Sequence, residues 1–225
     1  MSLERRWGER AVEQVDRHGR PIGGRRPPAV RRSSPTLGIF NMTGERMTAS
    51  ELIATYIRAK DSNRAHLMTA AFAPNASLEM VVNAGTISFP PHTTGIDAIT
   101  SVLVSRFGQT FENVYTFCLC APPNSDPSAF SCAWLVGMSE KDGGAVRVGS
   151  GRYDWIFGAG DTGLVVRLKI TIEHMQTLPS SHLPTIMSWL SRLPYPWCSA
   201  DAAVGTMPQL SELQSFAKQL REMEK

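Results

Sequence analysis

Hydrophobic residues recur at helical spacing in three segments of the first half of the chain. The first segment starts at a capping box, in which Thr48 and Glu51 can each satisfy a backbone N–H of the other, and its apolar stripe predicts a helix over residues 48–61. The second segment predicts a short helix over residues 63–73, and the third predicts a helix over residues 94–107. Helices are therefore expected to form most of this half.

Apolar and polar residues alternate, as they do in strands, in five further segments. These segments are residues 76–83, 111–120, 130–139, 145–157 and 164–176. The last four are separated by turns rich in Pro, Asp or Gly, which suit antiparallel hairpins, so they predict a meander. Gly149 and Gly151 lie inside the fourth segment and predict a bulge or a sharp bend there.

Three regions organise the 225 residues. Residues 1–46 are rich in Arg, Gly and Pro and hold few large aliphatic residues, so we expect a disordered extension; a natural start at Met42 or Met47 is an alternative interpretation. Residues 47–178 hold the elements of one predicted domain. Residues 179–225 predict a helical extension, which either packs on the outer face of the sheet or supports a dimer.

Charge is unevenly distributed along the chain, whose formal net charge is +3. Residues 1–46 hold ten arginines against five acidic residues, whereas the rest of the chain is nearly neutral, so we expect no nucleic-acid partner. The sequence has no apolar run long enough to span a bilayer and no secretory signal. We therefore expect a cytoplasmic protein without a membrane partner.

Several kinds of chemistry are excluded by missing motifs. A P-loop, a dinucleotide-binding fingerprint and a Gly-x-Ser-x-Gly elbow are absent, which argues against nucleotide-dependent enzymes and serine hydrolases. No His, Cys, Asp or Glu cluster has metal-ligand spacing, so we expect neither a metal nor a cofactor. The four cysteines lack the paired spacing of a zinc site and are predicted to be buried thiols.

Several short runs resemble one known family. They are Tyr56–Asp61, Leu67–Phe72 with Pro74–Ala76, Gly95–Ile99, Gly151–Asp154 and Ile172–His174. Together with the order of the predicted elements, these runs make residues 48–178 similar to the SnoaL-like branch of the nuclear transport factor 2-like superfamily. The resemblance implies an α+β fold, in which a curved antiparallel sheet and three helices from the N-terminal half form a cone with an internal pocket. We expect a homodimer whose pocket takes a small apolar or aromatic molecule.

His174 and Asp154 are the first candidates for chemistry in such a pocket. His174 follows Ile170 and Ile172 on one face of the last strand, so it is either a pocket histidine that exchanges protons near neutral pH or a buried structural one. Asp154 lies on the apolar face of its strand. It can orient His174 if the two strands are neighbours with matching faces, or it can pair with Arg152.

Asp61 and Tyr56 are the candidates on the first helix. Asp61 stands where the dehydratase-like members of the family keep a pocket Asp, although Lys60 replaces the tyrosine that precedes it there. The alternative is that Asp61 only caps the following turn. Tyr56 lies on the apolar stripe of the helix, so its hydroxyl either reaches the pocket or makes a single hydrogen bond in the core.

These candidates predict a cofactor-independent lyase, isomerase or hydrolase that acts on a small, largely apolar substrate. In this hypothesis His174 is the general acid or base, Asp154 orients it, and Asp61 and Tyr56 position the substrate or a water molecule. A non-catalytic ligand-binding or dimerising module of the same fold is the alternative, and a subunit of a larger oxygenase assembly is a third. A solvent-reachable pocket where His174 and a carboxylate converge would favour the enzyme, and a closed apolar interior the binding module.

Overall fold

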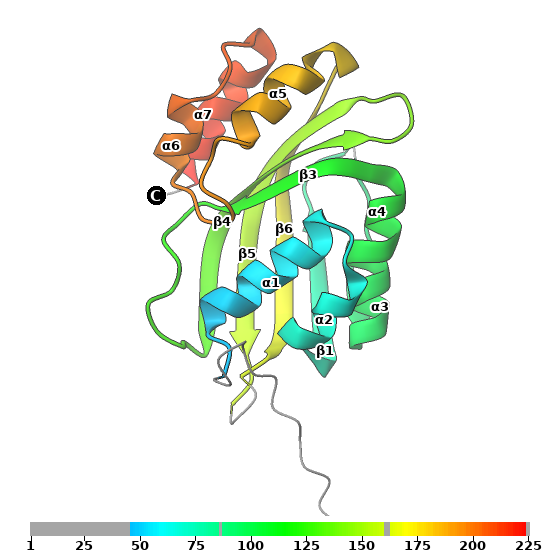
Figure 1. Cartoon of the computed structure of the whole chain (residues 1–225). Coiled ribbons are helices and arrows are strands. Elements are labelled where there is room, and N and C mark those ends of the chain that lie inside the picture. The colour runs from blue at the N-terminus through cyan, green and yellow to red at the C-terminus, as the bar shows by residue number, and fades with distance from the viewer. Residues whose placement is uncertain (1–45, 86, 160–162, 224–225) are drawn as a thin grey trace, which may run out of the picture. The chain divides into compact units, whose positions relative to one another are not determined.

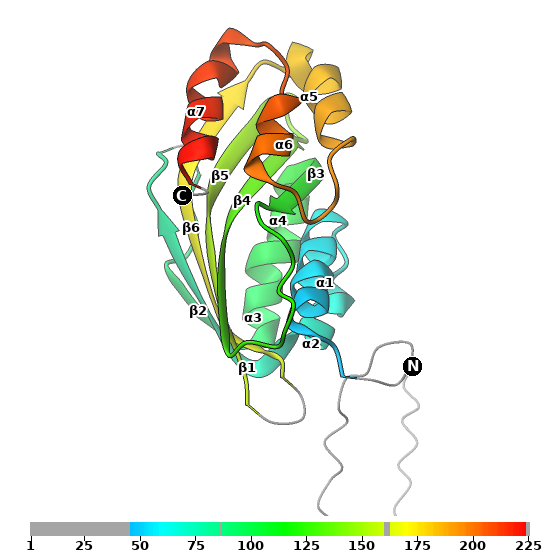
Figure 2. The ribbon, with the colours of Figure 1, turned by 90° about the vertical axis from the view of Figure 1, so that its left-hand side faces the viewer.

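The structure of the chain is a computed structural model, which describes residues 46–85, 87–159 and 163–223. The predicted extension, residues 1–46, lies outside the described residues except for Arg46. The described part is an α+β domain with helices on both faces of one curved sheet (Figure 1, Figure 2). This is the fold class that the sequence predicts.

The sheet has six strands in the order β2-β1-β6-β5-β4-β3. They are β1 Phe72–Val82, β2 His92–Thr94, β3 Phe111–Cys118, β4 Ala129–Glu140, β5 Val146–Phe157 and β6 Val165–Leu178. The predicted meander is present as β3 to β6, and each of its neighbouring pairs is antiparallel. One pair that the pattern did not indicate is parallel, because β6 returns beside β1 in the same direction. The short edge strand β2 was expected as loop.

One face of the sheet is covered by the helices of the first half (Figure 1). They are α1 Ala49–Asp61, α2 Met68–Ala71, α3 Ile96–Thr100 and α4 Phe107–Thr110, with the π-helical segment Ser101–Arg106 between α3 and α4. The capping box predicted before α1 is present: the Thr48 hydroxyl accepts from the Glu51 N–H, and the Glu51 carboxylate accepts from the Thr48 N–H. These elements enclose a core with side chains such as Leu52, Phe72 and Trp155, each at most 2% exposed.

The end of α1 is shaped by a left-handed residue. Asn63 has a φ of 49°, and the chain turns back so that the Arg64 N–H donates to the Ala59 carbonyl and the Asn63 N–H to the Lys60 carbonyl. This pattern is a Schellman motif, in which a residue able to adopt the left-handed conformation ends the helix. It fixes Lys60 and Asp61 in the last turn of α1, beside β3.

The other face of the sheet is partly covered by the C-terminal helices (Figure 2). They are α5 Leu183–Leu190, α6 Ala200–Gly205 and α7 Gln214–Glu222. A second core joins them to the sheet through side chains such as Leu135, Val148, Trp189 and Phe216. Of the two interpretations of this segment, the structure therefore has the packing on the outer face. Among the described residues, no helix has both the length and the apolar character needed to cross a membrane.

A bulge separates the two halves of the β5–β6 pair. Ser150 lies opposite His174, but the next residue, Gly151, lies opposite Ile172, so Glu173 is an extra residue on β6. A Cβ atom on Gly151 would collide with the Thr171 carbonyl and the Trp134 ring, which explains why glycine occupies this position. The glycines in the fourth strand segment thus mark the bend that the sequence predicts. Its consequence is that side chains beyond Glu173 on β6 change faces.

Candidate functional site

A cavity of about 50 Å³ lies between the sheet and the helices of the first half. Its wall is mostly apolar, with side chains from α1, the helical segment after residue 96, the loop after β1 and strands β1, β3, β4, β5 and β6. The polar members are Tyr56, Lys60, Thr116, Trp134 and Tyr153. The structure therefore has the internal pocket implied by the cone, and its polar groups gather on α1 and on strands β3 to β5.

A surface depression of about 330 Å³ adjoins this cavity. The two spaces share the side chains of Ile87, Phe89 and Phe107 in their walls. Ile87 and Phe89 come from the loop between β1 and β2, and Phe107 comes from the start of α4. Three apolar side chains thus separate the interior from a larger space at the surface.

Tyr56 is at the centre of an aromatic cluster beside the cavity. Its ring makes edge-on contacts with Trp155, Phe72 and Tyr153, with centroid distances of 5.3, 5.7 and 6.1 Å. Tyr56 is fully buried, and its hydroxyl has no hydrogen-bond partner among the described residues. The same is true of the indole N–H of Trp134, which also lines the cavity. Buried hydroxyl and indole donors usually have partners, so these two donors are available to an acceptor in the cavity. The indole N–H of Trp155, in the same aromatic cluster but outside the cavity wall, also has no partner among the described residues.

Burial keeps both cavity phenols protonated. It raises the pKa of Tyr56 and of Tyr153 well above the ordinary value for tyrosine, and the Asp61 carboxylate raises both pKa values further. Tyr153 is close enough to lower the pKa of Tyr56 in part, but the two hydroxyls do not meet hydrogen-bond geometry. Both groups are therefore hydrogen-bond donors at every physiological pH, and neither can serve as a base there.

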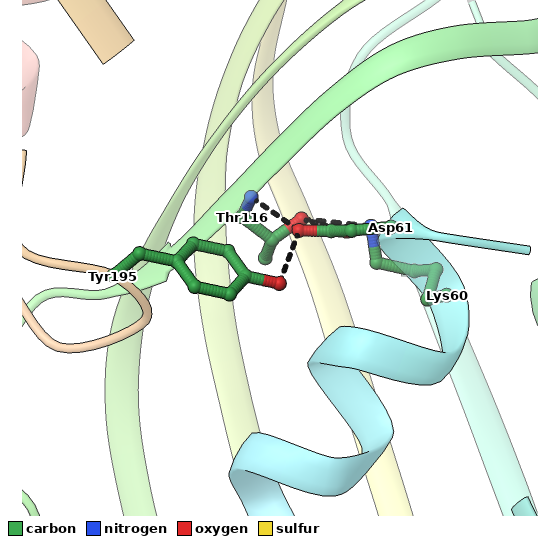
Figure 3. A network of polar contacts seen from close by, with 4 residues as sticks. All are labelled: Lys60, Asp61, Thr116 and Tyr195. Carbon is green, nitrogen blue, oxygen red and sulfur yellow. Dashed lines mark hydrogen bonds and ion pairs between the residues drawn. The ribbon is translucent and has the colours of Figure 1, made fainter. Parts of the chain in front are cut away.

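Lys60, Asp61 and Thr116 form a closed polar network at one wall of the cavity (Figure 3). The Lys60 ammonium donates to Asp61 Oδ1 and to Thr116 Oγ1, each at 2.7 Å. The Thr116 hydroxyl donates to Asp61 Oδ1 at 2.8 Å, and its backbone N–H donates to Asp61 Oδ2 at 2.7 Å. Asp61 Oδ2 also accepts from the Tyr195 hydroxyl at 3.1 Å. The carboxylate thus accepts four hydrogen bonds and has little capacity left as a base.

The network is buried and faces the cavity through its cation. The side chains of Lys60 and Asp61 are 8% and 4% exposed, and Thr116 is fully buried. The Lys60 ammonium lies 4.8 Å from the centroid of the Phe107 ring, in the cavity wall. Two of its three N–H groups are used by Asp61 and Thr116, which leaves one N–H that these two partners do not use. The Lys60 ammonium, whose charge is balanced by the Asp61 carboxylate, therefore faces a mostly apolar cavity.

Of the four predicted site residues, Tyr56 alone lines this cavity. Asp61 accepts a hydrogen bond from Lys60, which lines the cavity, but Asp61 itself lines a separate surface pocket with Tyr195. His174 does not line the cavity, because the Glu173 bulge turns Met175 to it and His174 to the outer face of the sheet, opposite Ser150.

Asp154 also lies on the outer face. Its Oδ1 accepts from the Ser131 hydroxyl at 2.6 Å, and it lies opposite Lys169 on β6. His174 lies opposite Ser150, four residues away along β5, which is about 13 Å at the rise of a strand. The orienting contact predicted between Asp154 and His174 is therefore not formed, and neither is the predicted alternative pair of Asp154 with Arg152.

Four of the polar cavity residues were not predicted as part of the site: Lys60, Thr116, Trp134 and Tyr153. Lys60 had a usable signal, because it stands four residues after Tyr56 and so occupies the same face of the helix. Thr116 had none, since its role depends on the approach of β3 to the end of α1. For Trp134 and Tyr153, the strand pattern alone does not separate a side chain that fills the core from one that lines a cavity.

The order of the elements matches the cone that the sequence resemblance implies. Three helical segments precede and flank β1 and β2, a four-stranded meander follows, and the curved sheet holds a cavity under the helices. The described residues therefore have a nuclear transport factor 2-like fold.

Several solved structures are similar to part of this chain. A nuclear transport factor 2-like superfamily protein from Salmonella enterica serovar Typhimurium is 20% identical, with a TM-score of 0.43 over 57% of this chain and 87% of that chain. A protein from Catenulispora acidiphila with a ketosteroid isomerase-like fold, solved with trimethylamine, is 16% identical, with a TM-score of 0.42 over 55% and 85%. A computationally designed 17-OHP binder is 15% identical, with a TM-score of 0.43 over 56% and 95%. No protein-family model matches the sequence, and no curated protein matches it.

Proposed function

We propose that the nuclear transport factor 2-like cavity binds a small, largely apolar molecule that carries one hydrogen-bond acceptor. The observation that supports this most is the pair of buried donors without partners, the Tyr56 hydroxyl and the Trp134 indole N–H, in an otherwise apolar wall. A ketone or ether oxygen would accept from them, while its hydrocarbon body would contact the apolar side chains. The Lys60 ammonium offers a third donor to the same space.

The ligand enters from the adjoining depression in this proposal. A cavity of about 50 Å³ is smaller than the engineered cavities of about 150 Å³ that hold benzene, so a ring needs more room than the closed interior gives. Rotation of Phe89 and Ile87 would join the cavity to the depression of about 330 Å³. The proposal therefore favours ligands with a ring or a short chain at the polar end and further apolar bulk toward the surface.

Matched ligands test the role of the unpaired donors. We would measure the thermal stabilisation given by cyclohexanone and by larger cyclic ketones, each beside its hydrocarbon of the same ring size, because stabilisation grows with occupancy. The ketones should stabilise more than the hydrocarbons. Tyr56→Phe should weaken ketone binding about 2- to 12-fold, the equivalent of one hydrogen bond, and leave hydrocarbon binding unchanged.

Tyr115→Phe is the matched control, because Tyr115 packs against the core on the other face of the sheet and does not line the cavity. It should leave the affinity for both ligand classes unchanged. Equal stabilisation by ketones and hydrocarbons in the unaltered protein would contradict the acceptor proposal. Stabilisation by neither class would contradict binding of this kind of molecule altogether.

A cofactor-independent lyase, isomerase or hydrolase in the same cavity is the second candidate function. The Lys60–Asp61 pair supports it, because a buried ammonium hydrogen-bonded to a carboxylate can move protons next to an apolar substrate. Against it stands the lack of a base with spare capacity: no histidine or carboxylate lines the cavity among the described residues. For this reason we place binding before catalysis.

Proton exchange separates the two candidates. An enzyme of this type would exchange the α-hydrogens of a bound ketone with deuterium from D₂O, and NMR would follow the loss of the signal. Lys60→Met and Asp61→Asn should then abolish the exchange while the folded spectrum persists. Exchange no faster than in buffer would exclude acid–base catalysis on such ketones and leave the binding function. The expected homodimer stays a prediction for either candidate, and sedimentation analysis would test it.

A further inference from the structure

Three cysteines gather where β3 and β4 meet, apart from the polar groups of the cavity. Cys118 and Cys132 are 0% and 3% exposed, and Cys120 is half-buried against the same core. All three face the helix-covered side of the sheet. Cys198, by contrast, belongs to the core on the other face. None of the four takes part in a disulfide in the structure.

Cys120 and Cys132 lie just beyond the last residue pair of β3 and β4, and their relative position follows from extending that register by two residues. The register of β3 and β4 places Cys118 opposite Trp134, and the Leu119 N–H donates to the Ala133 carbonyl at 2.8 Å. Continuing this register places Cys120 opposite Cys132, next to a hydrogen-bonded pair. Such a position is a non-hydrogen-bonded pair, in which the Cα atoms are about 4.5 Å apart. Disulfides span Cα distances of about 4.4–6.8 Å, so two cysteines in such a pair are within the range that a disulfide requires.

The sulfur atoms are in contact, and they differ in reactivity. The thiol of Cys118 raises the pKa of Cys132, burial raises it further, and the contact with Cys120 lowers it in part. Cys132 is therefore a poor thiolate at neutral pH. Cys120 is more exposed than either neighbour, so it is the cysteine that an oxidant in solution meets first.

We propose that Cys120 and Cys132 are a redox modification site and form a reversible cross-strand disulfide with a small-molecule disulfide such as oxidised glutathione. The Cys120 thiolate attacks one glutathione sulfur, forms a mixed disulfide and releases one glutathione thiolate. Cys132 then loses its proton, its sulfur attacks Cys120, and the second glutathione leaves as a thiolate. Two cysteine thiols are oxidised and one glutathione disulfide is reduced to two glutathione molecules, so atoms and electrons balance.

The link would lie at the base of a loop that holds α1. Residues 119–128 connect β3 to β4, and within them the Asp126 carboxylate accepts from the Ala49 N–H at 2.9 Å. This bond satisfies one of the unpaired donors at the start of α1. The disulfide would close the loop at its two ends and so restrain the Asp126 contact. The redox state of Cys120 and Cys132 is thereby coupled to the helix that carries Tyr56 and Lys60.

The full-length chain treated with oxidised glutathione tests the proposal. Intact mass should fall by two hydrogen atoms, and reduced glutathione should restore it. Cleavage on the amino side of Asp126 separates Cys120 from Cys132, so under non-reducing conditions the two fragments should stay joined. Hydrogen exchange of residues 121–128 and of the first turn of α1 should slow in the oxidised form.

Single substitutions identify the pair. Cys120→Ser should abolish the joined fragments, whereas Cys118→Ser and Cys198→Ser should keep them. Cys120 is only half-buried, so its variant is expected to fold, and a melting curve of the reduced protein checks this. Joined fragments that persist in Cys120→Ser would assign the link to Cys118 and overturn the proposal. A glutathione adduct that never resolves, or no oxidation at all, would overturn it equally.

Discussion

Two aspartates on opposite faces of the sheet differ in their burial and in their hydrogen-bond partners. On the face covered by α1 to α4, Asp61 is 4% exposed and is held by Lys60, Thr116 and Tyr195. On the outer face, Asp154 is half-buried and accepts a hydrogen bond from Ser131. The first carboxylate is the partner of Lys60, a cation that lines the cavity, and the second lies on the surface of a strand.

The difference teaches that a polar residue in an apolar strand pattern does not by itself indicate a site. His174 and Asp154 were both expected in the cavity because of the apolar residues in their rows. The outer face is also apolar where α5 to α7 cover it, so a row of apolar residues in a strand can lie on either face of the sheet. Which face a row lies on follows from its pairing with the neighbouring strands and from the bulge at Glu173.

The largest expected effect contrasts the two aspartates. Asp61→Ala leaves the buried Lys60 ammonium without its carboxylate and should lower the free energy of unfolding by about 3–5 kcal/mol. Asp154→Ala removes a hydrogen bond at a half-buried position and should cost about 0.5–1.5 kcal/mol. Urea unfolding of both variants gives the comparison. Equal losses would show that the two faces do not differ in the way the burial indicates.

The bulge between the faces gives the next effect. Gly151→Ala places a methyl group against the Thr171 carbonyl and the Trp134 ring, and should cost about 1–3 kcal/mol. Gly205→Ala is the matched control, because its Cβ would meet nothing within 4 Å. That variant should unfold at the same urea concentration as the unaltered protein or slightly above it. A Gly151→Ala protein of unchanged stability would mean that the sheet tolerates a different register there.

Alkaline pH tests the burial of the phenols on the cavity side. The folded-state pKa of Tyr56 is raised, so the stability linked to this group is fully present below the unfolded pKa of about 10 and is lost as pH rises through the folded-state pKa. The free energy of unfolding should fall above pH 10 by up to about 1.4 kcal/mol per pH unit for each such tyrosine. Tyr56→Phe should reduce this slope, with no difference in slope between pH 7 and 9. An unchanged slope would show that Tyr56 ionises normally.

The smallest effect is expected on the outer face. His174→Ala should leave the affinity for the ketone probes unchanged and alter the free energy of unfolding by no more than about 0.5 kcal/mol. The reason is that His174 points away from the cavity and its place there is taken by Met175. Titration of the same ketone into both proteins provides the measurement. A tenfold loss of affinity in His174→Ala would return this residue to the site.

Local patterns predicted much of the architecture. The capping box at Thr48 places the start of α1 within one residue, and the strand boundaries of the meander differ by no more than about two residues from the alternating segments. Short elements such as α6 and β2 were not predicted, because a segment of so few residues shows no recognisable hydrophobic periodicity. The parallel pairing of β1 with β6 was missed for another reason: it is a long-range contact without a local signal.

The candidate site was predicted less completely than the fold. Tyr56 followed from the apolar stripe of α1, and Asp61 from the family resemblance. The predicted face of His174 assumed strict alternation along β6. The extra residue Glu173 breaks this alternation and places His174 on the opposite face. The glycines that allow the bulge are visible in the sequence of β5, but the strand that receives the extra residue is not. Thr116 and Tyr195 belong to the network because the fold brings them next to Asp61, from which they are distant in the sequence.

The β1–β6 pair has a consequence for how the protein is made. It joins segments that lie ~90 residues apart, so one edge of β1 has no partner on the ribosome until almost the whole sheet has been synthesised. During that interval Leu78 and Met80, which are buried in the folded protein, lack their neighbours on β6. Translation speed between β1 and β6, and chaperones that bind nascent strands, are therefore expected to determine how much of the newly made chain avoids aggregation.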